Sequence, residues 1–274
     1  MACMKARGFT LTELLVVISL VAALMALSLS ALRRVREQAK SVVCQSNQRQ
    51  LLVEFGVYEA THGALPPGFD PMGFTTPPGG WAGSAARDPS AWWWFHCLGL
   101  RTPPRRSTEP TLLRCPSNPV TDPLLSRRVL YSNYGVNWSL CRTVVAPMPN
   151  EEFRGTPLRT SNLLRAAQTL LLVDSGYALI SWHHVTADPP LPLGSRHGQD
   201  SSYLPGLSIN QGRDLLPSQM DDALYGRHPN KTVNVGFADG HVGRQIAEAL
   251  LVTHTGSGYS NLCPLWSPPG ASGP

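Results

Sequence analysis

The longest apolar run in the chain covers residues 9–32, near the N-terminus. It reads FTLTELLVVISLVAALMALSLSAL, with Glu13 as its one charged residue and no Gly or Pro to interrupt a helix. At ~1.5 Å per residue, such a helix is about 36 Å long, which exceeds the ~30 Å hydrocarbon core of a bilayer. A secretory signal peptide would have a shorter apolar core followed by a small-residue cleavage site, which is missing before Arg33. The pattern therefore predicts a retained transmembrane helix.

The helical pattern continues beyond the apolar run, over residues 33–63. Apolar residues recur at helical spacing and form one stripe: Val35, Ala39, Val42, Val43, Leu51, Leu52, Phe55 and Tyr58. Gly63, followed by Pro66 and Pro67, is typical of a helix end. We expect one helix from about residue 9 to residue 62, whose second half buries this stripe against a β-sheet. Arg33, Arg34 and Arg36 follow the span and are expected to anchor it at the membrane surface.

The rest of the chain alternates strand patterns with loops rich in Gly and Pro. Strands are predicted over residues 129–140 and 169–176, and residues 178–184 are expected to pair with the latter as a hairpin. Residues 232–237 and 241–244 alternate around Asp239-Gly240, which predicts a hairpin with a type I′ turn. Residues 65–110 form a long loop whose aromatic run at 92–95 either packs in the core or makes an exposed patch; we favour the core. Residues 189–217 read as a variable surface insertion.

Composition and charge narrow the choice of partner and compartment. Only 15% of the 274 residues are charged, and the 24 Gly and 25 Pro exclude a helical bundle throughout. The net charge of +5 includes Lys5 and Arg7, and no basic run exceeds two residues, so we expect no nucleic-acid partner. Six widely spaced cysteines form no CxxC pair, and their pairing is left open.

The N-terminal junction MKARGFTLTELLVVISL is similar to the leader of type IV pilins and type II secretion pseudopilins. A short basic leader ends in Gly8, aromatic Phe9 follows, and Glu13 is the fifth residue counted from Phe9. The resemblance implies that prepilin peptidase cleaves between Gly8 and Phe9 and methylates Phe9. It also implies a single-pass inner-membrane protein with an extracytoplasmic (periplasmic) head. A carboxylate in a membrane span is costly unless it is paired. Glu13 either snorkels to the interface or pairs with the Phe9 amino group of a neighbouring subunit in an assembly role, which we favour.

The C-terminal part resembles a second family signature, the H-X9-DG element of the DUF1559 proteins, which carry prepilin-type N-termini. Here the element corresponds to His228, Asp239 and Gly240, and the segments CQSNQRQL, LPPG, RCPS and YGVN fit the same family. Ten residues, instead of nine, separate His228 from Asp239, so a bulge or longer loop near residues 229–234 must absorb one residue. The resemblance implies a class of protein, but it does not indicate that the protein catalyses a reaction.

The motifs of catalysis and of metal binding are absent from the sequence. There is no GxSxG, P-loop, GxGxxG or HExxH motif, so we expect no enzyme and no cofactor. A metal site from His228, Asp239 and His241 is conceivable, although a turn explains Asp239. Calcium is the more plausible ion, with Asp221, Asp222 and Asp239 as oxygen ligands, but the EF-hand pattern is lacking.

These observations predict an α+β protein of pilin-like architecture, in which a long N-terminal helix packs on an antiparallel β-sheet with long Gly/Pro-rich loops. The expected divisions are a leader (1–8), the transmembrane half of the helix (9–32), its extra-membrane half (33–63) and a β-rich head (64–274). The favoured function is a pseudopilin-like structural subunit of a type II secretion or type IV pilus-like filament. Its partners would be prepilin peptidase, other pilin-like subunits and inner-membrane lipid. The alternative is a membrane-anchored binding module that does not polymerise; an anchored hydrolase is a third interpretation.

Overall fold

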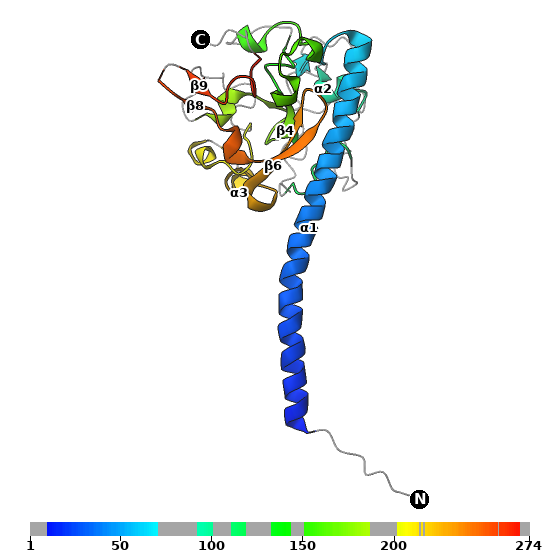
Figure 1. Ribbon diagram of the computed structural model, residues 1–274, viewed down its shortest axis with the longest axis vertical. Helices are drawn as coiled ribbons and strands as arrows, with labels where there is room; N and C mark the ends of the chain where they lie inside the picture. The colour runs from blue at the N-terminus through cyan, green and yellow to red at the C-terminus, as the bar shows by residue number, and fades with distance from the viewer. Residues whose placement is uncertain are drawn as a thin grey trace, which may run out of the picture.

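The computed structural model describes residues 10–70, 92–100, 111–118, 133–143, 151–186, 202–213, 215, 217–256 and 258–268. Gly8 and Phe9, the predicted processing site, lie outside these residues, as do residues 71–91 of the predicted 65–110 loop and residues 189–201 of the predicted insertion. The described chain is α+β: one very long helix packs against a small β-rich head (Figure 1).

Helix α1 (Leu11–His62) has a clear cap at each end. Thr10 is the N-cap and forms a capping box with Glu13, in which each side chain bonds the other residue's backbone N–H. At the C-terminal end, Gly63 adopts a left-handed conformation (φ 78°), and its N–H donates to the Glu59 carbonyl at 2.7 Å. The helix end predicted from Gly63 is confirmed.

A five-stranded sheet forms the centre of the head, in the order β5-β3-β4-β6-β7. Its strands are β3 (Tyr134–Asn137), β4 (Leu170–Asp174), β5 (Leu179–Ile180), β6 (Thr232–Phe237) and β7 (Val242–Ile246). Neighbouring strands are antiparallel except β3 and β5, which run parallel. Every residue of β4 and β6 is buried, as expected for central strands covered on both faces. The predicted pairing of residues 178–184 with the preceding strand is therefore wrong, because β5 crosses over to the far side of β3.

Shorter elements complete the head. They are β1 (Phe69–Asp70), β2 (Trp92–Trp93), α2 (Trp94–Cys97), α3 (Pro217–Tyr225), β8 (Thr253–His254) and β9 (Tyr259–Ser260). Single 3-10 turns cover Glu151–Phe153, Thr160–Asn162, Ala166–Gln168, Trp182–Val185, Ser208–Gly212, Pro229–Lys231 and Ala247–Leu250.

Trp94 and Phe95 are fully buried, and the Trp94 ring stacks on Phe55 of α1 with the ring centroids 5.5 Å apart. The aromatic run thus belongs to the core, as we predicted.

The second half of α1 lies along β6 and β7 (Figure 1). Its buried face consists of Ser41, Cys44, Gln48, Leu51, Leu52 and Phe55. The predicted stripe is correct from Leu51 onward and wrong before it, because Val35, Ala39, Val42 and Val43 are exposed. In this part of the helix, polar residues face the sheet because the sheet supplies polar partners for them. The side-chain oxygen of Asn234 in β6 accepts a hydrogen bond from Gln45 Nε2 (3.0 Å), and its backbone carbonyl accepts one from Gln48 Nε2 (3.1 Å).

Candidate functional site

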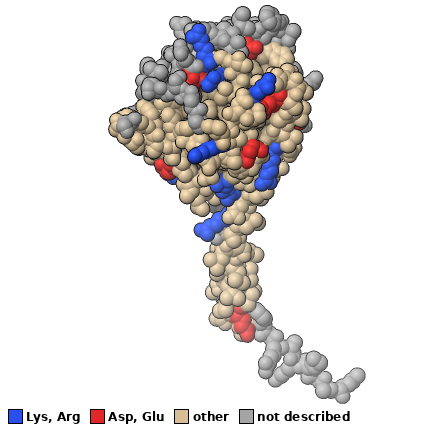
Figure 2. Space-filling model, turned by 45° about the horizontal axis from the view of Figure 1, so that its top comes forward, with Lys and Arg blue, Asp and Glu red and all other residues tan. Residues whose placement is uncertain are grey.

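The first candidate site is the stalk, which we define as residues 11–32 of α1. Its large apolar side chains are all exposed, from Leu11 at 78% to Leu32 at 58%, and it projects from the head without touching it (Figures 1 and 2). In the described part of the chain, α1 contains an apolar segment long enough to cross a membrane, and none of that segment is buried within the protein. Figure 2 shows an almost uncharged stalk with an acidic group near its free end and basic groups where it meets the head. A soluble chain would not leave such a surface uncovered.

Glu13 lies at the free end of the stalk, where its carboxylate accepts hydrogen bonds from Thr10, the N-cap of the same helix. Thr10 donates to Glu13 Oε2 from its backbone N–H at 2.9 Å and from its hydroxyl at 2.7 Å. The carboxylate therefore sits at the positive end of the helix, where the macrodipole favours a negative charge. The capping box thus fixes the carboxylate at the N-terminal end of the described helix.

The residues of the predicted C-terminal signature do not form one site. His228 is buried before β6, whereas Asp239 and Gly240 occupy the exposed turn after it, so six strand residues, or about 20 Å, separate them. Asp239 Oδ1 pairs instead with His241, at 2.6 Å from Nδ1. The metal site of His228, Asp239 and His241, which the sequence left conceivable, is thus excluded by the fold.

Of the two turns next to β6, one differs from the prediction and the other agrees with it. The hairpin loop has three residues, 238–240, and of these three described residues only Gly240 has positive φ (93°), so the turn is not type I′. On the other side of β6, Asn230 (φ 59°) and Lys231 (φ 52°) are both left-handed in a tight turn, where we expected the additional residue to be absorbed.

The predicted calcium ligands are also dispersed. Asp222 is buried and forms an ion pair with Arg227, at 2.6 Å between Oδ2 and Nη2, and it accepts from the Tyr203 hydroxyl at 2.8 Å. Asp221 is exposed on α3, and Asp239 lies in the hairpin turn. Asp221, Asp222 and Asp239 therefore cannot share one ion in this fold.

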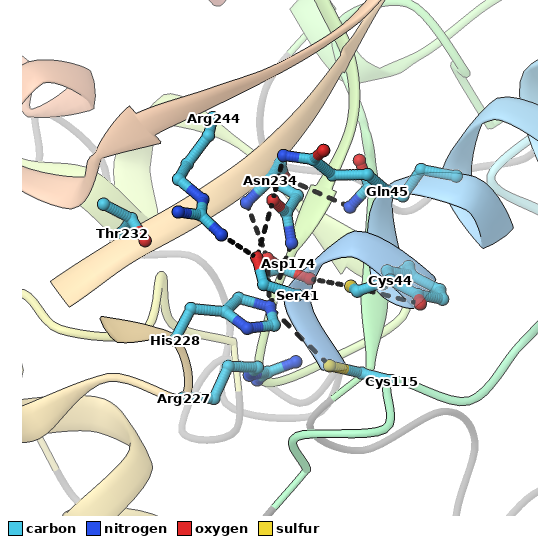
Figure 3. A network of polar contacts seen from close by, with 12 residues as sticks. Ser41, Cys44, Gln45, Cys115, Asp174, Arg227, His228, Thr232, Asn234 and Arg244 are labelled. Atoms are coloured by element: carbon cyan, nitrogen blue, oxygen red, sulfur yellow. Dashed lines mark hydrogen bonds and ion pairs between the residues drawn. The ribbon is translucent and has the colours of Figure 1, made fainter. Parts of the chain in front are cut away.

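The second candidate site is a buried cluster that the sequence analysis did not anticipate. Cys44, Cys115, Asp174 and His228 each offer one ligand atom, and these atoms all lie within 4.8 Å of one another (Figure 3). Cys44 Sγ is 3.2 Å from Asp174 Oδ1, His228 Nε2 is 3.1 Å from Asp174 Oδ2, and Cys115 Sγ is 3.8 Å from His228 Nε2. We call these four residues the buried cluster.

Neighbouring groups hold the cluster in place. The backbone N–H of Asn234 donates to Asp174 Oδ2 at 2.6 Å, and the Tyr134 hydroxyl donates to Cys44 Sγ at 3.3 Å. The Asn133 side-chain oxygen accepts from the backbone N–H of Cys115 at 2.9 Å. The Arg227 guanidinium, itself fully buried, donates to the Ser175 carbonyl at 3.0 Å, one residue after Asp174. The ligand atoms are thus fixed by a second layer of hydrogen bonds.

Charges within the cluster compensate for its burial. Burial by itself raises the pKa of the Cys115 thiol, but hydrogen bonds with Cys44 and His228 lower it to about 6. Burial by itself lowers the pKa of His228, but the charge and hydrogen bond of Asp174 raise it to about 9. Burial would raise the pKa of Asp174, yet His228 and Arg227 hold it below its ordinary value. Burial raises the pKa of Cys44 well above its ordinary value.

The sequence carried only weak signals for this cluster. Asp174 ends an apolar strand and precedes Ser175-Gly176, a sequence typical of a turn, and the six cysteines are widely spaced without a CxxC pair. The five described cysteines are free thiols in this structure: Cys44, Cys97, Cys115, Cys141 and Cys263. An Asp at the end of a fully apolar strand, and a Cys on the buried side of a helix, are the two signals that could have pointed here.

Comparison with known families identifies the N-terminal segment. The prokaryotic N-terminal methylation motif matches residues 3–29, which include residues 3–8 of the predicted leader and most of the stalk. Neither the curated proteins nor the solved structures contain a match to the chain. The resemblance to the DUF1559 proteins and their H-X9-DG element stays a prediction. The chain therefore carries a prepilin-type N-terminal signal, followed by an exposed apolar helix long enough to anchor it in a membrane with a single span.

Proposed function

We propose that this protein is a pseudopilin-like structural subunit of a type II secretion or type IV pilus-like filament. Its stalk would lie in the inner membrane before assembly, with the head on the extracytoplasmic side. Its partners would be other pilin-like subunits, and its role would be mechanical, without catalysis. The observation that carries this proposal is the stalk itself: a 22-residue apolar surface that the head leaves entirely uncovered.

Glu13 supports assembly over simple anchoring. A carboxylate within a membrane span is costly unless it is paired, so a plain anchor gains nothing from an acid at this position. In a filament, the carboxylate can pair with the Phe9 amino group of a neighbouring stalk, which neutralises both charges in an apolar environment. The capping box with Thr10 keeps the carboxylate at the end of the helix where that amine would arrive. The pairing would also fix the axial offset between two subunits.

The test is filament recovery by shearing from the native host, comparing wild type with Glu13→Gln. The variant keeps the side-chain size and a hydrogen-bond acceptor but removes the charge. Losing about 1.4 kcal/mol at each contact between subunits lowers the association constant about tenfold. Because many such contacts act along a filament, we expect the yield of sheared filaments to fall at least tenfold. Processing of the leader should be unchanged, because Glu13 follows the cleaved bond.

Glu37→Gln is the matched control. Glu37 lies on the same helix beyond the stalk, where it forms an exposed pair with Lys40 at 2.8 Å, and its loss should leave filament yield unchanged. Equal filament yields from Glu13→Gln and wild type would overturn the assembly role. A processed wild-type chain that never enters the sheared fraction would support the alternative of a membrane-anchored binding module that does not polymerise.

A further inference from the structure

We propose that Cys44, Cys115, Asp174 and His228 bind one structural Zn²⁺ ion that ties α1 to the head. The inference does not depend on filament assembly, since it concerns the fold of a single chain. Its residues differ from both sets of candidate metal ligands considered in the sequence, and only His228 is shared with one of them.

The spacing of the four ligand atoms fits a tetrahedral ion. Zinc bonds of ~2.0–2.3 Å place neighbouring ligand atoms about 3.3–3.8 Å apart at the edges of a tetrahedron. The distances are 3.2 Å from Cys44 Sγ to Asp174 Oδ1 and 3.8 Å from Cys115 Sγ to His228 Nε2. Along these two edges the ligand atoms already lie within a few tenths of an ångström of that spacing, and all four atoms lie within 4.8 Å of one another.

The chemistry of the donors selects the kind of ion. Two cysteine sulfurs and one imidazole are ligands that zinc favours, and a carboxylate is a common fourth ligand. Calcium and magnesium prefer oxygen ligands throughout, and this cluster offers oxygen only from Asp174. Binding Zn²⁺ would displace the thiol protons of Cys44 and Cys115 and any proton on His228 Nε2, and would leave no net change in oxidation state.

Burial and second-layer contacts indicate a closed, structural site. All four residues are buried, and His228 is the most accessible of them at 4%. A catalytic zinc keeps one open position for water, whereas four protein ligands fill a tetrahedral structural site. The Asn234 N–H on Asp174 and the Tyr134 hydroxyl on Cys44 are contacts of the kind that orient metal ligands.

The positions of the ligands in the chain explain what the ion would do. Cys44 comes from α1, Cys115 from the 111–118 segment, Asp174 from the end of β4, and His228 from the turn before β6 (Figure 3). One ion would join four segments that are distant in sequence, and it would attach the second half of α1 to the central sheet. Such a cross-link would resist separation of helix and head when force is applied to the stalk.

The rival state is a disulfide between Cys44 and Cys115, which an oxidising compartment would favour. A disulfide removes both thiolates and leaves Asp174 and His228 as a pair without an ion. Metal content and thiol content in the same sample therefore separate the two states.

The experiment uses the full chain, purified in detergent through an affinity tag that contains no histidine. We expect about one zinc ion per chain by elemental analysis, and free thiols at Cys44 and Cys115 after alkylation under denaturing conditions and peptide mapping. Replacement of zinc by Co²⁺ should give the intense visible bands of tetrahedral cobalt together with a thiolate charge-transfer band. This optical signature reports the ligands in the folded wild type, without any variant.

Variants then assign the ligands. Asp174→Asn and His228→Gln should lower zinc content at least tenfold, and Cys115→Ser should weaken the thiolate charge-transfer band. Tyr134→Phe, which removes only a second-layer contact, should weaken zinc affinity about 10- to 100-fold. His241→Gln and Cys141→Ser are the matched controls, because each changes the same residue type outside the cluster, and both should keep the wild-type metal content.

Three results would overturn the proposal. The first is a mapped Cys44–Cys115 disulfide in protein from the native compartment. The second is reduced wild-type protein that takes up no zinc and gives no tetrahedral cobalt spectrum. The third is zinc that is retained when His228 or Asp174 is replaced in a folded variant, as judged by its circular dichroism.

Discussion

Gly236 of β6 is the position where the packing of α1 against the sheet can be tested most sharply. A Cβ added at Gly236 would lie 2.8 Å from Leu52 Cδ1, 3.3 Å from Leu52 Cγ and 3.4 Å from Leu52 Cδ2. Gly236 is paired on both sides, with Leu172 of β4 and Val242 of β7, so the strand cannot move away. The Leu52 side chain or the helix must shift instead. Overpacking of this kind typically costs about 1–3 kcal/mol.

We therefore expect Gly236→Ala to lower the free energy of unfolding by about 1–3 kcal/mol, equivalent to roughly 2–10 °C in Tm. The assay is urea unfolding of the full chain in detergent, followed by tryptophan fluorescence. Two controls bracket the effect. Gly56 lies on the exposed side of the same helix with nothing within 4 Å of an added Cβ, so Gly56→Ala should stabilise by about 0.5–1 kcal/mol. Gly243→Ala, with its nearest neighbour at 3.6 Å, should be close to neutral.

A double-mutant cycle identifies the clash partner. Leu52→Ala alone should cost about 2–5 kcal/mol, because it removes a buried side chain. In the double variant the new methyl group meets no leucine, so the combined loss should be smaller than the sum by about 1–2 kcal/mol. Strictly additive losses, or Gly236→Ala as stable as Gly243→Ala, would refute the helix–sheet contact described here.

Three further predictions concern the head. Burial lowers the pKa of His96 and His183 to about 4, and burial followed by Arg213 lowers that of His184 well below its ordinary value. These histidines are neutral in the folded chain, so their contribution to the free energy of unfolding is complete above about pH 6.5. That contribution is lost as the pH falls toward 4, at up to about 1.4 kcal/mol per pH unit for each group. The urea midpoint should therefore drop between pH 7 and pH 5, and by less in His96→Gln than in wild type; a midpoint that does not change with pH would contradict this. Arg227→Ala leaves the buried Asp222 carboxylate without its ion-pair partner and should lower the free energy of unfolding, measured by thermal unfolding, by about 3–5 kcal/mol. Lys40→Ala breaks the exposed pair with Glu37 and should lower it by less than about 1 kcal/mol. Similar losses in the two variants would show that burial of the ion pair is unimportant. Lys231→Gly, at φ 52°, should raise stability by about 0.5–1 kcal/mol by calorimetry while Lys231→Ala should not, and equal effects would argue against a left-handed residue there.

The long helix and its end could be predicted because local signals determine them. An uninterrupted apolar run sets the stalk, and Gly63 before Pro66 and Pro67 sets the end. The β6–β7 hairpin was also predictable, since Asp239-Gly240 separates two alternating segments, although the three-residue turn was not.

The buried side of α1 was predicted only in part because hydrophobicity alone does not decide burial there. Ser41, Cys44 and Gln48 face the head since Asn234 and Asp174 supply partners for their polar atoms. Val42 and Val43, although apolar, point to solvent. The partners come from strands about 130 to 190 residues away in the chain, and sequence periodicity contains no information on such pairs.

The buried cluster was missed for the same reason. Cys44, Cys115, Asp174 and His228 come from four segments and match no short metal-binding motif. The crossover that places β5 beside β3 is also long-range, and a hairpin is the simpler expectation for two adjacent strands.

The measurement that tests the central claim most directly is the intact mass and N-terminal sequence of the protein extracted from the membranes of its native host. A chain that begins at N-methylated Phe9 is the predicted result, because the resemblance of residues 4–20 to a prepilin leader implies cleavage after Gly8 and the methylation motif matches residues 3–29. A chain that retains residues 1–8, or one that begins beyond the stalk, would contradict the account of a processed pilin-like subunit.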